Sequence, residues 1–137
     1  MHERFCGVVM LARTVDKARA AAAESLGVYE YDCPMDRAVF AFLGIEAAPF
    51  LAAVRGATTD AALAEYVQPF VDRKTPAEVE RWNAGFITYV PRDGSDSARR
   101  LCALRDRLAP ERTDIVTWAD VIDLDEGRAV PRRVPAR

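Results

Sequence analysis

The fold class is decided by the stretch TPAEVERWNAGFITYV at residues 75–90. Thr75, Pro76 and Glu78 form a capping box with proline at the first helical position, the clearest helix start in the chain. Apolar residues follow at helical spacing, namely Val79, Trp82, Phe86, Tyr89 and Val90. This stretch therefore predicts an amphipathic helix that ends before a turn at residues 91–94.

Helix signals of the same kind occur along the rest of the chain. One apolar repeat runs from Leu11 to Leu26 before a glycine stop, and a second helix fits between Pro34 and Gly44. Further helices are predicted at residues 50–56, 58–70, 95–108 and 117–127. Pro69 is expected to kink or end its helix.

Strand signals are weak throughout the sequence. No segment alternates apolar and polar residues for long, and no Asn-Gly or Asp-Gly pair joins two β runs. The connections between the predicted helices are short. The sequence therefore predicts an all-α protein, an irregular orthogonal bundle of about seven short helices with little or no sheet.

Length and charge bound the organisation of the chain. Its 137 residues suit a single helical domain, predicted at residues 1–128, followed by a basic, flexible tail at 129–137 with little apolar surface to bury. The net charge of -2 gives no reason to expect a nucleic-acid partner. No apolar stretch approaches the ~20 residues of a membrane helix and no signal peptide is evident, so we predict a cytoplasmic protein without a membrane partner.

The scarcity of histidine excludes several kinds of chemistry. His2 is the sole histidine, which disfavours a catalytic triad, a Cys-His dyad and a histidine metal site. Cys6, Cys33 and Cys102 are too widely spaced for a disulfide framework or a zinc motif. There is no Gly-rich phosphate loop. We expect no cofactor and no metal, and any catalysis must use carboxylate, phenol, thiol, Arg or Lys groups.

One group of candidate residues lies at the start of the second predicted helix. Cys33 is placed where a helix N-terminus favours the thiolate, so it is either a nucleophile or a packed capping residue. Tyr31, Asp36 and Arg37 are candidates for ligand contacts, and Asp36 also for acid–base catalysis. Lys17 shares a helix face with Arg13 and Asp16, which forms either an anion-binding edge or a solvated ion pair.

A second group follows in the C-terminal half of the chain. Asn83 borders the apolar stripe beside Trp82, and a buried amide there needs a loop backbone or a ligand as its partner. The densest polar segment, at residues 112–126, begins with Arg112 and Asp114. These two residues either serve a ligand site or tie an irregular loop together through an ion pair.

Several segments together resemble a bacterial family known as domain of unknown function 5069. They are LARTVDKARA (11–20), YDCPMD (31–36), FLGI (42–45), WN (82–83) and RTDIVTWADVIDLDEGR (112–128). Polar residues of the family pattern present here are Arg13, Asp16, Lys17, Asp36, Asn83, Arg112, Asp114, Thr117 and Asp120. The resemblance implies a compact helical domain and no assigned activity. Ala12 stands where family members often have proline, at the entry to the first helix.

Two functions from different classes fit these features. The first is a small-molecule-binding domain or a cofactor-independent acid–base enzyme of lyase, isomerase or cyclase type, acting on a polar organic substrate. Its site residues are Asp36, Asp114 and Cys33 for catalysis, and Tyr31, Arg37, Trp82, Asn83, Arg112, Thr117 and Trp118 for substrate binding. The alternative is a protein–protein interaction or regulatory module, including a homodimeric one.

Overall fold

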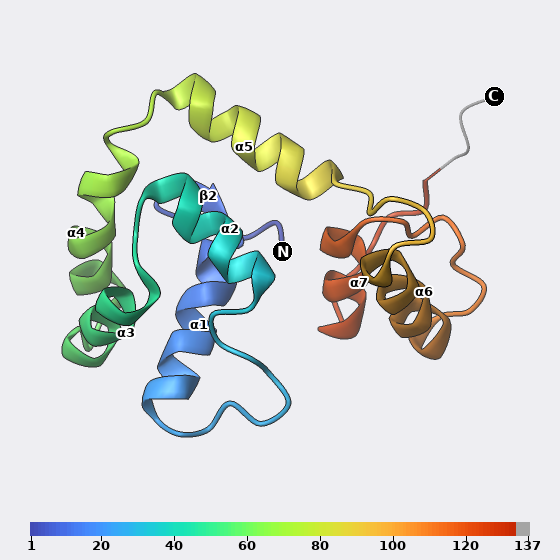
Figure 1. Cartoon of the computed structure of the whole chain (residues 1–137), viewed down its shortest axis with the longest axis horizontal. Helices are drawn as coiled ribbons and strands as arrows, with labels where there is room; N and C mark the ends of the chain where they lie inside the picture. The colour runs from blue at the N-terminus through green and yellow to red at the C-terminus, as the bar shows by residue number, and fades with distance from the viewer. Residues whose placement is uncertain (134–137) are drawn as a thin grey trace. The chain divides into compact units, whose positions relative to one another are not determined.

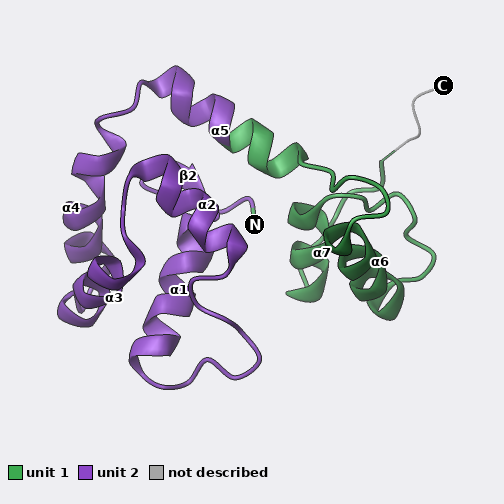
Figure 2. Cartoon of the chain, in the orientation of Figure 1, with its two compact units in different colours: residues 1, 83–137 green, residues 2–82 purple. Residues whose placement is uncertain are grey.

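The computed structural model describes residues 1–133, which divide into two compact units (Figure 2). Unit 2 is residues 2–82, and unit 1 contains Met1 and the chain from Asn83 onward. Residues 1–133 contain seven helices and two very short strands (Figure 1), which confirms the predicted all-α class with little sheet. The end of the predicted basic tail, residues 134–137, lies outside the described residues.

Unit 2 begins with a hairpin and continues with helices. Its elements are β1 (Arg4–Phe5), β2 (Val8–Val9), α1 (Leu11–Ala22), α2 (Pro34–Leu43), α3 (Ala47–Gly56), α4 (Asp60–Val71) and the first half of α5 (Pro76–Thr88).

Among residues 1–133, no single helix is long and apolar enough to cross a membrane. The adjoining pair α2 and α3 would pass on length and composition, but it is bent by 89°.

The hairpin was not foreseen from the sequence. Strands β1 and β2 pair antiparallel, with Arg4 opposite Val9 and Phe5 opposite Val8. The two turn residues, Cys6 and Gly7, both have positive φ angles, 50° and 79°. Positive φ at both central positions is the geometry of a type I′ turn, which usually selects Asn-Gly or Asp-Gly. Because cysteine stands at the first turn position, the Cys6-Gly7 pair does not match the usual sequence pattern of this turn.

Helix α1 ends one turn earlier than predicted. The apolar repeat extended to Leu26, whereas the helix ends at Ala22. The amide of Ser25 donates to the carbonyl of Ala20, and Glu24 adopts a left-handed φ of 53°. This is a Schellman ending in which Glu24 occupies the position that glycine usually takes. Loop residues 23–33 then lead to α2.

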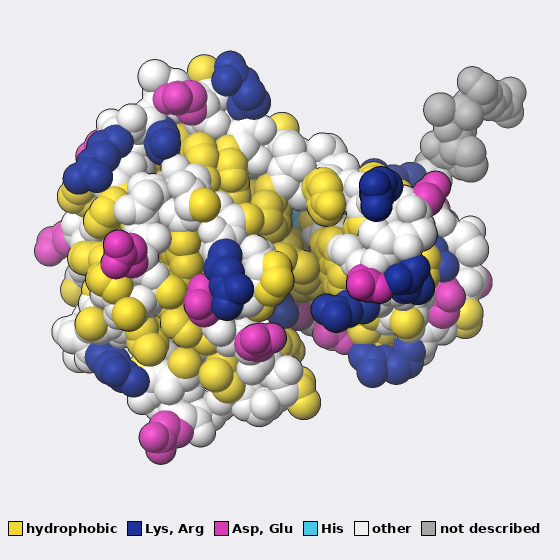
Figure 3. All heavy atoms as spheres, in the orientation of Figure 1, with side chains coloured by type: hydrophobic (Ala, Val, Ile, Leu, Met, Phe, Trp, Pro, Cys, Tyr) yellow, Lys and Arg dark blue, Asp and Glu magenta, His cyan; other side chains and the backbone are white. Residues whose placement is uncertain are grey.

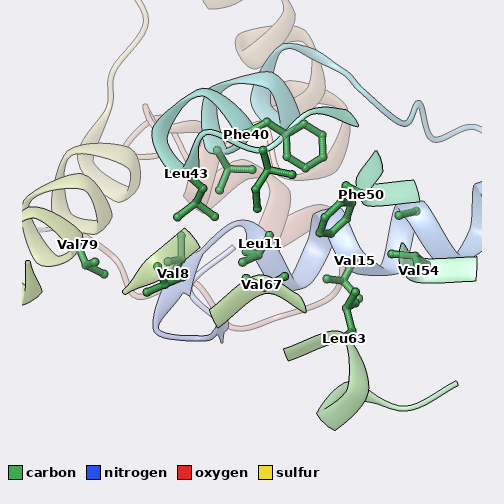
Figure 4. Close-up of a cluster of buried hydrophobic side chains, with 14 residues drawn as sticks. Val8, Leu11, Val15, Phe40, Leu43, Phe50, Val54, Leu63, Val67 and Val79 are labelled. Atoms are coloured by element: carbon green, nitrogen blue, oxygen red, sulfur yellow. The ribbon is translucent and has the colours of Figure 1, made fainter. Parts of the chain in front are cut away.

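The apolar core of unit 2 is built from every one of its helices. Figure 4 shows Val8, Leu11, Phe40, Phe50 and Val67 converging from β2, α1, α2, α3 and α4. The rings of Phe40 and Phe50 pack with centroids 5.1 Å apart. Since each helix is short, burial of these side chains supplies most of its stability.

Two predicted details of α4 and α5 differ in the structure. Of the two outcomes expected at Pro69, a helix end is wrong, because α4 continues two residues past it and ends at Val71. Helix α5 ends at Thr88, so Tyr89 and Val90 are not on its apolar face and are both exposed. The residue before a proline is restricted to extended backbone, and Pro91 therefore excludes Val90 from the helix.

Unit 1 contains the second half of α5, α6 (Asp96–Leu108) and α7 (Trp118–Asp125). Helices α6 and α7 pack against each other. Both helices are capped by a side chain at the start of their predicted ranges, because Ser95 accepts the amide of Ala98 and Thr117 accepts the amide of Asp120, each at 3.1 Å. Buried apolar residues of unit 1 are Met1, Leu101, Ala109, Ile115, Ala119, Val121 and Ile122.

Candidate functional site

A buried polar cluster joins α1 to α2 in unit 2. It consists of Thr14, Lys17, Cys33 and Asp36, called the Lys17 cluster below. The Lys17 ammonium donates to Asp36 Oδ2 at 2.6 Å, to Cys33 Sγ at 3.2 Å and to the carbonyl of Glu30 at 3.0 Å. These three contacts use all three ammonium protons.

The Asp36 carboxylate is equally engaged. Its Oδ1 accepts the Thr14 hydroxyl at 2.7 Å, and its Oδ2 accepts the Cys33 amide at 3.1 Å as well as the Lys17 ammonium. The Asp36 side chain has no exposed surface. Asp36 is the third residue of α2, where a carboxylate reaches back to the capping residue. These contacts favour a structural role for Asp36, fastening α2 and the 23–33 loop to α1.

The other candidates at the start of α2 also have partners. Tyr31 donates its hydroxyl to the carbonyl of Ala47, the first residue of α3, at 2.7 Å. Burial, followed by the charges of Asp36 and Asp32, raises the pKa of Tyr31, so its phenol stays protonated. The exposed Arg37 guanidinium lies 3.3 Å from Asp32.

Unit 1 holds a second polar cluster around Arg112. The Arg112 guanidinium donates from Nε to Asp114 Oδ1 at 2.8 Å and from Nη2 to Asp114 Oδ2 at 2.9 Å. It also donates to the carbonyls of Val130 and Pro131. The amide of Arg133 donates to Asp114, and the Arg133 side chain pairs with Asp120. The Arg112 cluster thus fastens residues 130–133 to the loop before α7.

The electrostatics of this cluster keep Asp114 ionised. The hydrogen bonds from the Arg112 side chain and then from the Arg133 amide hold the pKa of Asp114 well below its usual range. The hydrogen bond with Asp114 correspondingly raises the pKa of Arg112. A carboxylate held in this way is a weak general base.

The remaining candidates divide between the two units. Trp82, in unit 2, stacks on Phe42 with ring centroids 4.9 Å apart. Asn83, in unit 1, is almost fully buried. Thr117 caps α7, and the Trp118 indole N–H donates to Ser97 at 2.8 Å. Among residues 1–133, no group of three His, Cys, Asp or Glu side chains is arranged to hold a metal ion.

An open hollow of about 410 Å³ lies in unit 2, where the hairpin meets the connection between α4 and α5. Its apolar wall is formed by Val71, Pro76 and Val79, and Gly7 of the hairpin turn also lines it. Its charged residues are Arg4, Asp72, Lys74 and Glu80. We refer to this feature as the hairpin hollow. None of its residues was among the sequence-based site candidates.

Two charges of the hairpin hollow are paired with each other. The Arg4 guanidinium donates to Glu80 through two nitrogens, at 2.6 and 3.3 Å. Asp72 accepts the side-chain amide of Gln68 at 2.7 Å, and its charge adds to burial in raising the pKa of the Cys6 thiol. The Lys74 ammonium lies 5.3 Å from the centre of the Phe42 ring.

Some of the missed residues had usable sequence signals. Thr14 falls inside the apolar repeat of α1, between Leu11 and Val15, so a buried hydroxyl could have been inferred. Lys17 borders the same stripe, and the structure buries it, whereas the sequence suggested a surface position. The hairpin hollow depends on the unforeseen hairpin, so no local pattern pointed to Lys74.

Over residues 1–133, fold and contacts define a small helical protein that contains the Lys17 cluster, the Arg112 cluster and an open hollow. The model of the family Domain of unknown function (DUF5069) matches residues 1–128, and the chain belongs to this family. The resemblance seen in the sequence is therefore confirmed. No curated protein matches the chain in sequence.

Proposed function

We propose that unit 2 is a small-molecule-binding domain and that the hairpin hollow is its binding site. The observation that carries this proposal is an apolar wall facing charged side chains in one concave feature. Ligand pockets combine these properties, with apolar contacts for affinity and a few polar groups for orientation. The volume of about 410 Å³ lies near the lower end of the usual range of ~300–1,000 Å³ and suits a small metabolite.

Binding is better supported than catalysis by the candidate acid–base groups. Asp36 is fully buried and accepts three hydrogen bonds, and Asp114 is held by the Arg112 guanidinium. Cys33 receives the Lys17 ammonium. A general base must reach the proton that it removes, and these contacts occupy the atoms that would do so.

A fragment screen on the isotope-labelled full chain tests this proposal. We expect small organic fragments to shift the amide signals of Gly7, Val71 and Val79 together. Asp72→Trp, which places an indole at the hollow, should abolish these shifts. Arg73→Trp is the matched control, since Arg73 is exposed and does not line the hollow. Fragments that shift no hollow residue, or that bind both variants equally, would refute the proposal.

A second candidate function is self-association through the 23–33 loop. The Val28 side chain is 97% exposed and Tyr29 beside it is 46% exposed. Hydrophobic side chains also extend over the face of unit 2 drawn in Figure 3, among separate basic and acidic side chains. Exposed apolar residues in a group commonly mark interaction sites.

Sedimentation velocity distinguishes this candidate. A homodimer that depends on the loop should dissociate when Val28→Ser and Tyr29→Ser are combined. Tyr89→Ser with Val90→Ser, in the connection after α5, serves as a control of equal hydrophobic loss. A wild-type protein that sediments as a monomer at all concentrations would eliminate self-association.

A further inference from the structure

We infer that the hairpin hollow recognises a small zwitterion with an apolar body, of the kind represented by an aliphatic α-amino acid. This inference rests on the proposed binding function and names the class of ligand. It follows from the charges that remain available at the hollow after the contacts within the protein are assigned.

Two of the four charged side chains at the hollow are paired with each other. Arg4 and Glu80 form a two-pronged ion pair with each other. A guanidinium and a carboxylate paired in this geometry satisfy each other's charge and much of each other's hydrogen bonding. This pair therefore forms a neutral part of the rim.

Lys74 and Asp72 are the other two charged residues that line the hollow. Among residues 1–133, neither side chain has an ion-pair partner within 4.0 Å. The contacts of Lys74 are the face of the Phe42 ring and a longer-range attraction to Glu78, whose carboxylate accepts the Thr75 amide. Asp72 accepts a neutral amide from Gln68. One ammonium and one carboxylate at the hollow thus have capacity for a ligand of opposite charges.

The apolar wall of the hollow belongs partly to the packed core. Val71 and Val79 are buried members of the core of unit 2, so the wall that they form with Pro76 is fixed by packing. Such a wall offers hydrophobic contact and no hydrogen bonds. A ligand that contacts Lys74, Asp72 and the apolar wall together needs a carboxylate for Lys74, an ammonium for Asp72 and an aliphatic side chain for the wall.

The test is an NMR titration of the full chain with L-leucine and two analogues that each lack one charge. The analogue 4-methylpentanoate keeps the carboxylate, and 3-methylbutylamine keeps the ammonium. We expect L-leucine to shift Gly7, Val71 and Val79 and to bind about tenfold more tightly than either analogue, because each charged hydrogen bond adds about that factor.

Variants assign each charge to its partner. Lys74→Met should weaken the binding of L-leucine and of 4-methylpentanoate about tenfold and leave the binding of 3-methylbutylamine unchanged. Asp72→Asn keeps an acceptor for Gln68. It should weaken the binding of L-leucine and of 3-methylbutylamine and leave the binding of 4-methylpentanoate unchanged. Arg73→Met, beside Lys74 with its guanidinium 5.2 Å from the centre of the Phe70 ring, is the matched control and should change nothing.

Each outcome decides between the two proposals. If L-leucine binds no more tightly than its analogues, or if Lys74→Met behaves like Arg73→Met, the zwitterion inference is wrong. The binding function survives that result when fragments still shift the hollow residues in the wild type. If neither fragments nor L-leucine shift those residues, both proposals fail.

Discussion

The Lys17 cluster in unit 2 and the Arg112 cluster in unit 1 use the same chemical pairing in different surroundings. The side chains of Lys17 and Asp36 are 8% and 0% exposed, and those of Arg112 and Asp114 are 11% and 19% exposed. Lys17 gathers three acceptors around one nitrogen, whereas Arg112 spreads its donors over a carboxylate and two carbonyls. Burial therefore decides how much stability is lost with one partner, while geometry decides whether lysine or arginine fits the cluster.

The largest effect is expected from breaking the more buried pair. Lys17→Met leaves the Asp36 carboxylate buried without a cation, which should lower the free energy of unfolding of unit 2 by about 3–5 kcal/mol. Urea denaturation can be followed through Trp82 fluorescence in a Trp118→Phe background, since Trp82 belongs to unit 2.

A double variant provides the control for this prediction. Lys17→Met with Asp36→Leu removes both charges and should be more stable than Lys17→Met alone, because no unpaired charge remains. A loss below about 1 kcal/mol for the single variant would show that the Lys17 cluster behaves like a surface ion pair.

Exchanging lysine and arginine between the two clusters tests whether each cluster requires the shape of its own cation. Lys17→Arg places a larger planar group where one nitrogen meets three acceptors, and we expect a loss of about 2 kcal/mol. Arg112→Lys keeps the charge but loses the two-pronged contact with Asp114, with a smaller loss in the more exposed cluster. Trp82 and Trp118 fluorescence, each in the absence of the other tryptophan, report the two units separately. If neither exchange destabilises its unit, the role assigned to geometry is wrong. Equal losses in both units would contradict the role assigned to burial.

The same two clusters show how far the sequence could predict this protein. The starts of the helices predicted at 95–108 and 117–127 could be found from the sequence because helix caps depend on neighbours three residues away. The Arg112–Asp114 pair was likewise readable as one of two alternatives, since its members are two residues apart. The contact of Lys17 with Asp36 joins residues 19 positions apart on two helices, and no local pattern specifies that distance.

The candidate site was less predictable than the helices for a related reason. The hairpin hollow brings Arg4 beside Glu80 across 76 positions and depends on a turn with Cys6 at a left-handed angle. Most of the polar residues that stood out in the sequence proved to be bonded to other groups of the protein. A dense polar pattern can therefore mark internal fastening as readily as a ligand site, and only the tertiary contacts separate the two.

Acidification should affect the Arg112 cluster through Asp114. The folded pKa of Asp114 lies below its ordinary value of about 3.9, so its stabilising contribution is complete above that value and is lost as the pH falls toward the folded pKa. Arg112→Ala should raise the pKa of Asp114 toward the ordinary value and reduce this acid dependence. Carbon-detected NMR titration of the Asp114 carboxyl measures the shift directly.

The control for the acid titration keeps the change of charge but removes no contact with Asp114. Arg107→Ala removes an exposed arginine of α6. It should leave the titration of Asp114 unchanged. An equal shift of the Asp114 pKa in Arg107→Ala and Arg112→Ala would show that net charge, and not the hydrogen bonds of Arg112, holds Asp114 ionised.

The smallest effect is expected at the 23–33 loop, which supplies two of the three acceptors of the Lys17 ammonium, the Glu30 carbonyl and Cys33 Sγ. Glu24 holds a left-handed φ of 53° at the end of α1, a conformation that costs about 1 kcal/mol for a residue with a Cβ. Glu24→Gly removes this cost but adds chain entropy to the unfolded state, for a net gain of about 0.5 kcal/mol. Ala23→Gly, at a φ of -92°, adds the entropy without relieving strain and should destabilise unit 2. The same loop also supplies the Glu30 carbonyl that accepts the Lys17 ammonium. If that contact alone holds the loop in place, Glu24→Gly should give no gain in stability. Urea denaturation of both glycine variants, with and without Lys17→Met, separates the strain in the turn from the hold exerted by the buried ammonium.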